Sequence, residues 1–343
     1  MAPVNWNRSY KQEEFIMTTA TICIMATILV YLVGMLYIGF HYAHKNESSS
    51  DFYLGGRKLG PLVTAMSAEA SDMSSYLLMG LPGLAYLSGA ADVGWTVIGL
   101  ALGTYFNWLF TAKRLRRYTH LTGSFTVPQF FSRRFKDEKN ILSLIAALVI
   151  IIFFIPYTAS GFAACGKLFS SLFGMNYMVA MILSAIVIIA YTVAGGFLAA
   201  SMTDFIQSII MTAAILFVLI FSTVSAGGLG VVLDNAKALP GYLSLTSTYV
   251  EATGTSEPYT FLHILTTLSW GLGYFGMPHI LLRFMAINDE KNLKLSRRVA
   301  SIWVVIAKAV GDVAGDAAEV GGGLIAGVER HIGEVHVLDH GLG

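Results

Sequence analysis

The sequence predicts an all-α integral membrane protein, and three observations support that prediction. The chain has 343 residues, of which 55% are hydrophobic and only 13% are charged, whereas soluble domains are about one-quarter charged. Apolar stretches long enough to cross a bilayer, which takes about 20 residues, recur along the whole chain. Loops rich in Lys and Arg alternate with loops that hold almost none, which is typical of a multi-pass protein.

Seven apolar spans follow a polar N-terminus. Their expected bounds are 15–40, 61–88, 92–112, 141–171, 177–197, 203–226 and 258–280. The first span is free of charge and too long for the apolar region of a signal peptide, so we interpret it as a retained helix. Lys and Arg concentrate in the loops on one side of these spans, at 41–60, 113–140 and 281–298. This asymmetry predicts that the N-terminus lies outside and that the basic loops lie in the cytoplasm.

The second span is interrupted by polar residues and by the helix-breaking pair Pro82-Gly83. It contains Glu69 and Asp72, and a carboxylate inside a bilayer is costly unless a cavity, a cation or a protein partner accepts it. Serines flank Asp72, so an unwound helix there would offer backbone carbonyls and hydroxyls as an all-oxygen cage for a hard cation such as sodium. The alternatives are that Asp72 pairs with an Arg elsewhere, and that Glu69 pairs with a basic residue at the helix end or shares a proton with Asp72.

The span 258–280 is also interrupted, by Pro278 and by three glycines in a G-x-G-x-x-G pattern, Gly271, Gly273 and Gly276. A dinucleotide site is a poor interpretation of that pattern, because no βαβ unit surrounds it. Two interrupted spans in corresponding positions of two halves are instead the best sequence indication of a transporter binding site. The spacing of the two breaks fits an inverted five-helix repeat.

Other polar and aromatic residues in the spans have two interpretations each. Trp270 and Tyr274 are four residues apart and share a helix face, a pattern that is more often core packing or an interfacial belt than ligand contact. Tyr157 follows the helix-kinking Pro156 and either places its hydroxyl in a cavity or packs. Asp204, at the start of the span 203–226, either has a function or caps that helix.

Several function classes fit the sequence poorly. The net charge of +1 lacks the excess of positive charge that is typical of nucleic-acid-binding proteins. Cys23 and Cys165 both lie in apolar spans, so no disulfide or metal framework is expected. No nucleophile–base arrangement or metal-ligand spacing occurs, so we expect neither an enzyme nor a cofactor. A membrane sensor would need a folded output domain after the spans, and the tail is too short for one.

The segment 307–343 differs from the rest of the chain. An eighth span begins near Val299 but loses its apolar character after Ile306, and the following residues are rich in Gly, Asp, Glu and His. We therefore expect a membrane transporter domain over 1–306 and a Gly-rich tail over 307–343. The tail is either an exposed segment or the product of a shifted reading frame, and the abrupt change of composition favours the second.

Several unusual stretches, taken in order, resemble the sodium:solute symporter family. They are 51–57 (DFYLGGR), 70–74 (ASDMS), 77–83 (LLMGLPG), 157–161 (YTASG), 195–199 (GGFLA), Thr203-Asp204 and the matching parts of 270–286 (WGLGYFG, PHIL, RFMA). The resemblance runs from about residue 15 to residue 306. It implies a leucine-transporter-like fold of two inverted five-helix repeats with an extra N-terminal helix, in which the second repeat is incomplete.

The resemblance is greatest to the proline-transporting members of the family. It implies sodium-coupled uptake of L-proline across a bacterial plasma membrane, with sodium as the coupling ion and the lipid bilayer as the protein's surroundings. Symport of another small solute, such as a different amino acid, a sugar or a vitamin, is the second hypothesis. A fragment that does not transport is the third.

The resemblance also assigns roles to individual residues. The residues that it implies for sodium binding or coupling are Asp72, Ser74, Asp204, Arg57 and the backbone carbonyls of Ala70 and Met73. The residues that it implies for the substrate pocket are Ser74, Ser75, Tyr76, Tyr157, Trp270, Tyr274 and Pro278. The chain departs from the usual family residues at Glu69, Ser75-Tyr76 and Met277, and these departures bear on the choice of substrate.

Overall fold

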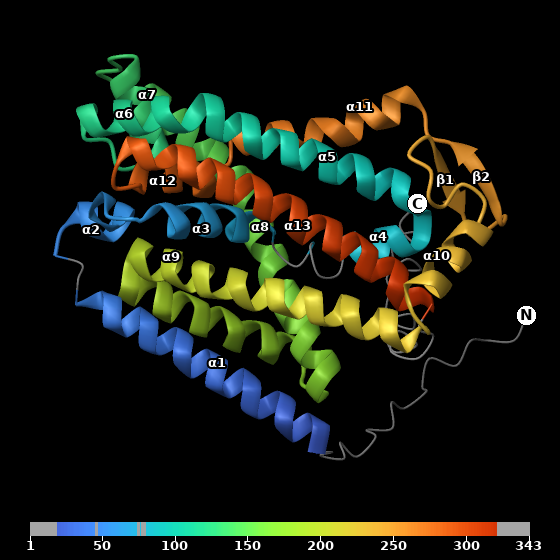
Figure 1. Ribbon diagram of the computed structural model, residues 1–343. Coiled ribbons are helices and arrows are strands. Elements are labelled where there is room, and N and C mark those ends of the chain that lie inside the picture. The colour runs from blue at the N-terminus through green and yellow to red at the C-terminus, as the bar shows by residue number, and fades with distance from the viewer. Residues whose placement is uncertain (1–18, 45–46, 74–75, 77–79, 321–343) are drawn as a thin grey trace, which may run out of the picture.

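The computed structural model describes residues 19–44, 47–73, 76 and 80–320, and this part of the chain is almost entirely helical (Figure 1). The first half contains α1 (Thr19–Ala43), α2 (Ser49–Leu54), η1 (Gly55–Arg57), α3 (Pro61–Met73), α4 (Leu81–Ser88), α5 (Ala90–Asn107), η3 (Trp108–Ala112), α6 (Lys113–Thr122), α7 (Val127–Arg134) and α8 (Ile141–Phe173). The second half contains α9 (Tyr177–Ser225), α10 (Leu229–Ala238), α11 (Phe261–Ser269), η4 (Trp270–Phe275), α12 (Pro278–Ala286), η5 (Glu290–Asn292) and α13 (Leu293–Val320).

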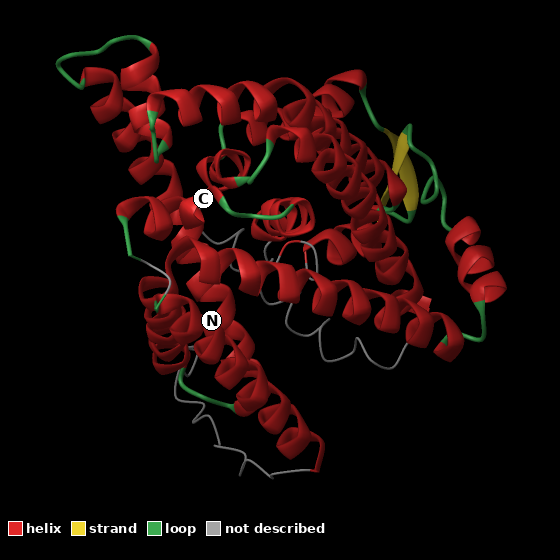
Figure 2. Ribbon diagram, turned by 60° about the vertical axis from the view of Figure 1, so that its left-hand side comes forward, coloured by secondary structure: helices red, strands yellow, loops and turns green. Residues whose placement is uncertain are grey.

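The predicted all-α class is confirmed, with one small exception. The loop between α10 and α11 contains a two-stranded antiparallel hairpin, β1 (Ser247–Val250) and β2 (Thr255–Pro258), in which Ser247 pairs with Pro258. Figure 2 shows the two strands at the periphery of the helical bundle. The hairpin therefore lies at the surface of the bundle and is not part of its core.

Four helices among the described residues are long and apolar enough to cross a membrane, namely Thr21–Ala43, Ala90–Thr122, Ile141–Phe173 and Tyr177–Ser225. The outer faces of α1, α8 and α9 expose many large apolar side chains, which lipid accepts and water does not. The 49 residues of α9 form two helices that meet at Gly196, where φ is 61° and ψ is −155°. Only glycine adopts that backbone readily. The predicted spans 177–197 and 203–226 are therefore the two parts of α9.

Both predicted interruptions are present. The second span is divided into α3, which ends at Met73, and α4, which begins at Leu81. Between them, Tyr76 and Gly80 have π-helical backbone, and residues 74–75 and 77–79 lie outside the described residues, so the expected unwinding there stays a prediction. The span 258–280 is divided into α11, the 3-10 helix η4 and α12. Each interruption places polar or aromatic side chains at mid-span.

Helix α13 runs through the bundle beside α3, α4, α5 and α9 (Figure 1). Trp303 and Val304 are buried in a core cluster with Met73 and Leu81. The helix continues past Ile306 to Val320, so residues 307–320 extend the eighth span rather than leaving it. Residues 321–343 lie outside the described residues, and the domain boundary at 306 stays a prediction.

The second interrupted span and α5 approach one another closely at glycines. The Gly99-x-x-x-Gly103 pattern is typical of close helix packing in membranes, and α5 uses it against α11 and η4. A Cβ on Gly99 would lie 2.7 Å from the carbonyl oxygen of Leu268, and one on Gly103 would lie 2.3 Å from that of Gly271. The glycines let backbone meet backbone, which brings η4 into the centre of the bundle.

This packing predicts different effects for two neighbouring glycines. A Cβ on Gly271 would lie 2.0 Å from the carbonyl oxygen of Gly99, whereas one on Gly273 would meet no atom within 4 Å. Gly271→Ala should therefore destabilise the folded protein by about 1–3 kcal/mol through overpacking. Thermal unfolding in detergent would show a lower midpoint for Gly271→Ala and almost no change for Gly273→Ala. Equal shifts in the two variants would contradict the close approach.

Candidate functional site

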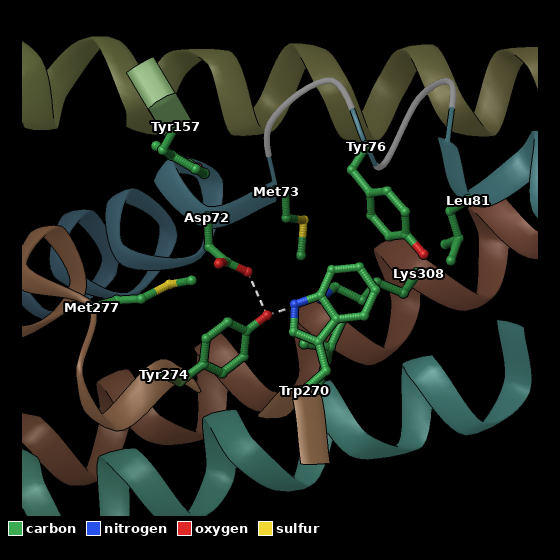
Figure 3. Close-up of a pocket in the computed structure, with 10 residues that line it drawn as sticks. Asp72, Met73, Tyr76, Leu81, Tyr157, Trp270, Tyr274, Met277 and Lys308 are labelled. Carbon is green, nitrogen blue, oxygen red and sulfur yellow. Dashed lines mark hydrogen bonds between the residues drawn. The ribbon is translucent and has the colours of Figure 1, made fainter. Parts of the chain in front are cut away.

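A cavity of about 100 Å³ lies where the two interrupted spans meet (Figure 3). Its walls come from α3, the segment after α3, α8, η4 and α13, which are far apart in the sequence. The lining residues are Asp72, Met73, Tyr76, Leu81, Leu100, Tyr157, Trp270, Tyr274, Met277 and Lys308. Six of these were predicted as site residues from the sequence, namely Asp72, Met73, Tyr76, Tyr157, Trp270 and Tyr274.

Asp72 is the polar centre of the cavity. It lies one residue before the end of α3, and its carboxylate accepts a hydrogen bond from the hydroxyl of Tyr274 (Figure 3). Tyr274, on η4, is only 1% exposed, so this contact joins the two interrupted spans in the interior of the protein. The Tyr274 hydroxyl in turn accepts a hydrogen bond of 3.0 Å from Nζ of Lys308 on α13.

Aromatic rings form much of the remaining wall. The rings of Tyr76 and Trp270 lie 5.0 Å apart between centroids and bring the segment after α3 against η4. Tyr157 reaches the same region from α8, where its hydroxyl donates to the carbonyl of Ser71 at 3.4 Å. The ring of His279 stacks on that of Tyr157 at 6.0 Å. These rings surround the carboxylate with apolar surface that carries a few polar tips.

The other predicted site residues that the structure describes lie outside the lining. Ala70 packs against the core cluster that contains Met73, and Pro278 begins α12 next to the lining residue Met277. Ser74 and Ser75 lie outside the described residues, so their roles stay predictions.

Asp204 lies in the second part of α9 and forms an ion pair with Arg283 of α12, with 2.7 Å between Oδ2 and Nη2. The two side chains are 19% and 8% exposed. The same carboxylate oxygen accepts hydrogen bonds from Ser67 at 2.8 Å and Ser71 at 2.9 Å, both on α3. The helix-cap interpretation of Asp204 is therefore wrong, because the carboxylate serves a network that joins three helices.

Arg57 holds together three segments at one end of the bundle and does not approach the cavity. Its guanidinium donates to the carbonyls of Met285 at 2.6 Å, Thr119 at 2.9 Å and Ser124 at 2.8 Å. Burial, helped by the nearby charge of Arg116, lowers the pKa of Arg57 to about 10. The side chain therefore stays cationic at neutral pH and can hold these carbonyl groups.

Sequence reasoning missed two charged partners. Arg283 is the single arginine or lysine within α12, and Lys308 is the single basic residue in the apolar run 301–310. An isolated charge in an apolar helix indicates a buried partner, so the signal was present, but the identity of each partner depends on tertiary structure. Glu69 is buried and accepts hydrogen bonds from Trp108 at 3.0 Å and Thr104 at 3.2 Å. The expected pairing of Glu69 with a basic residue at the helix end is therefore wrong.

Comparison with known proteins identifies the family. The model of the sodium:solute symporter family matches residues 52–315. The sodium/proline symporters of Staphylococcus aureus strains USA300 / TCH1516 and JH9 are each 43% identical to this chain over 281 residues, which is 81% of this chain and 53% of theirs. The chain thus spans about half the length of the curated relatives it matches. The resemblance inferred from the sequence is confirmed at the level of the family.

A solved structure supports the fold. The structure described as the substrate-bound outward-open state of a Na+-coupled sialic acid symporter matches with a TM-score of 0.71. The match covers 86% of this chain and 60% of that one at 18% sequence identity, so it bears on the fold alone. The helical architecture of the described residues therefore has the same fold as that structure.

The Asp204–Arg283 ion pair gives a testable coupling. Asp204→Asn or Arg283→Gln should each destabilise the protein by about 3–5 kcal/mol at most, because each leaves one largely buried charge without its partner. The double variant removes both charges, so it should be less destabilised than the sum of the two single variants. Unfolding midpoints in detergent for the four proteins measure this coupling. Additive losses would contradict a direct interaction between the two side chains.

Proposed function

Since the chain belongs to the sodium:solute symporter family, we propose that its cavity binds L-proline together with sodium. The complete transporter would use this site for sodium-driven proline uptake across the bacterial plasma membrane. The observation that carries the proposal is the position of Asp72, a carboxylate that faces a cavity between two interrupted spans. The similarity to sodium/proline symporters supports proline as the solute.

Sodium requires oxygen ligands, and few side chains near the cavity can supply them. Within the described part of the chain, no group of three or more His, Cys, Asp or Glu side chains could hold a metal ion. Asp72 would therefore supply the negative charge, while backbone carbonyls of Ala70 and Met73 and the hydroxyl of Ser74 complete the cage. Because these residues adjoin the interruption after α3, bound sodium would stabilise the segment that forms the substrate wall.

Proline suits the remaining surface of the cavity. Tyr76, Tyr157 and Trp270 offer aromatic faces to an apolar ring, and Met277 adds a flexible apolar contact. The substrate carboxylate would face the N-terminal end of α12, where unpaired backbone N–H groups favour a negative charge. Sodium and proline would thus share the interrupted segments, and binding of each ligand would favour the other.

The proposal extends to the orientation of the helices. The basic loops 41–60, 113–140 and 281–298 would lie in the cytoplasm and the N-terminus outside, with the helices paired as inverted five-helix repeats. Arg57 would then act on the cytoplasmic side, where it donates a hydrogen bond to the last turn of α12. Asp204 would receive sodium on its way to the cytoplasm, because its serine partners on α3 adjoin Asp72.

Binding of radiolabelled proline to the purified chain in lipid nanodiscs, with sodium chloride or choline chloride, tests the proposal. We expect sodium to raise the affinity for proline. Asp72→Asn should reduce that increase by roughly 10- to 100-fold, which corresponds to the free energy of a hydrogen bond to a charged group. Asp92→Asn is a matched control, because Asp92 accepts a 2.6 Å hydrogen bond from Tyr259 outside the cavity.

Competition by unlabelled solutes defines the substrate in the same assay. Sodium-dependent displacement by proline alone supports the proposal. Displacement by a sugar or another amino acid, with no effect of proline, would leave the family in place and reject the substrate. An unchanged sodium effect in Asp72→Asn would reject Asp72 as the coupling carboxylate.

A further inference from the structure

Lys308 is a cationic side chain inside the cavity that none of the proposed roles uses. It is 4% exposed, and its Nζ donates to the Tyr274 hydroxyl at 3.0 Å (Figure 3). That hydroxyl donates its own proton to Asp72, so one tyrosine oxygen separates the ammonium group from the carboxylate.

The charges in and near the cavity favour an electrostatic interaction between Lys308 and Asp72. Among the ten described residues that line the cavity, Asp72 is the only acid and Lys308 the only base. Asp204 already has Arg283 as its partner, and Glu69 is held by the neutral donors Trp108 and Thr104. Two opposite charges in a poorly solvated cavity attract each other strongly, so the carboxylate and the ammonium group stabilise each other.

A bound sodium ion at Asp72 would occupy the same electrostatic position as this ammonium group. Lysine supplies one positive charge on a covalent stem, and it does so at every sodium concentration. A sodium ion that entered the site would lie within a few ångströms of a like charge and would gain less from the carboxylate. The contact with Tyr274 holds the ammonium group beside Asp72.

Building on the proposed sodium site, we propose that Lys308 is a tethered internal cation that competes with sodium for Asp72. It makes this chain a weak sodium binder and ties η4 to α3 without the ion. Lys308 therefore determines the cation affinity of the pocket, although it is not itself a ligand of sodium.

Binding of ²²Na⁺ to the purified chain in nanodiscs tests this inference. Lys308→Met keeps the length and apolar stem of the side chain and removes its charge, so we expect sodium to bind roughly 10- to 100-fold more tightly than in the unmodified chain. Lys308→Arg keeps the charge and should leave sodium binding weak. Lys237→Met is a control at a solvent-exposed position, paired only with Asp234, and should change nothing. Lys308→Gln serves as a second neutral variant.

The role of Asp72 is tested in the same background. Adding Asp72→Asn to Lys308→Met should remove the gain in sodium affinity. If Lys308→Met and Lys308→Gln bind sodium no more tightly than the unmodified chain, while Asp72→Asn still weakens binding, the sodium site stands and the internal-cation inference is overturned. If no variant binds sodium, or if Asp72→Asn has no effect in either background, the proposed sodium site fails together with the inference.

A third readout, the binding of proline, separates two roles for the lysine. Loss of proline binding in Lys308→Met with unchanged sodium affinity would overturn the inference and assign Lys308 to the substrate carboxylate. Gained sodium affinity with proline binding retained supports the internal cation.

Discussion

A charge buried among membrane-spanning helices needs a partner. The contacts that satisfy this need hold the described structure together. Each buried carboxylate near the cavity finds its partner on a different helix. Asp72 on α3 binds Tyr274 on η4, and Asp204 on α9 binds Arg283 on α12 together with hydroxyls of α3. Both contacts connect the first interrupted span with the second. The polar contacts that make burial tolerable are therefore also those that assemble the site from distant parts of the chain.

Close backbone packing makes these contacts possible. Tyr274 reaches Asp72 only because η4 lies deep in the bundle, and η4 lies there because Gly99, Gly103 and Gly271 allow α5 to touch it backbone to backbone. Asn107 of α5 then donates to the carbonyl of Tyr274 at 2.8 Å and fixes the short 3-10 helix. Of the three glycines that look like a nucleotide-binding pattern in the sequence, Gly271 thus serves helix packing. Its function in the site is indirect, through the position of Tyr274.

The parts of the structure that could be predicted are those that local sequence determines. The length of the apolar stretches predicted the spans. Pro82-Gly83 and the glycines of 271–276 predicted the interruptions, and the serines beside Asp72 predicted the cavity. The partners of buried charges could not be predicted, because they depend on how helices pack. Asp204 at the start of an expected span suggested a cap, yet the helix continues around it and Arg283 lies opposite. Lys308 was assigned to a tail because composition changes after Ile306, whereas α13 extends past that point.

The position of Lys308 bears on coupling as well as on affinity. Two ligands are coupled when one of them changes the segment that the other binds. At the proposed site, sodium would act in this way only by changing the contact between α3 and η4. Lys308 already supports the Tyr274–Asp72 contact in the described structure. The change that sodium makes there would therefore be smaller than in the same pocket without the lysine charge, and the coupling free energy would be reduced but not abolished.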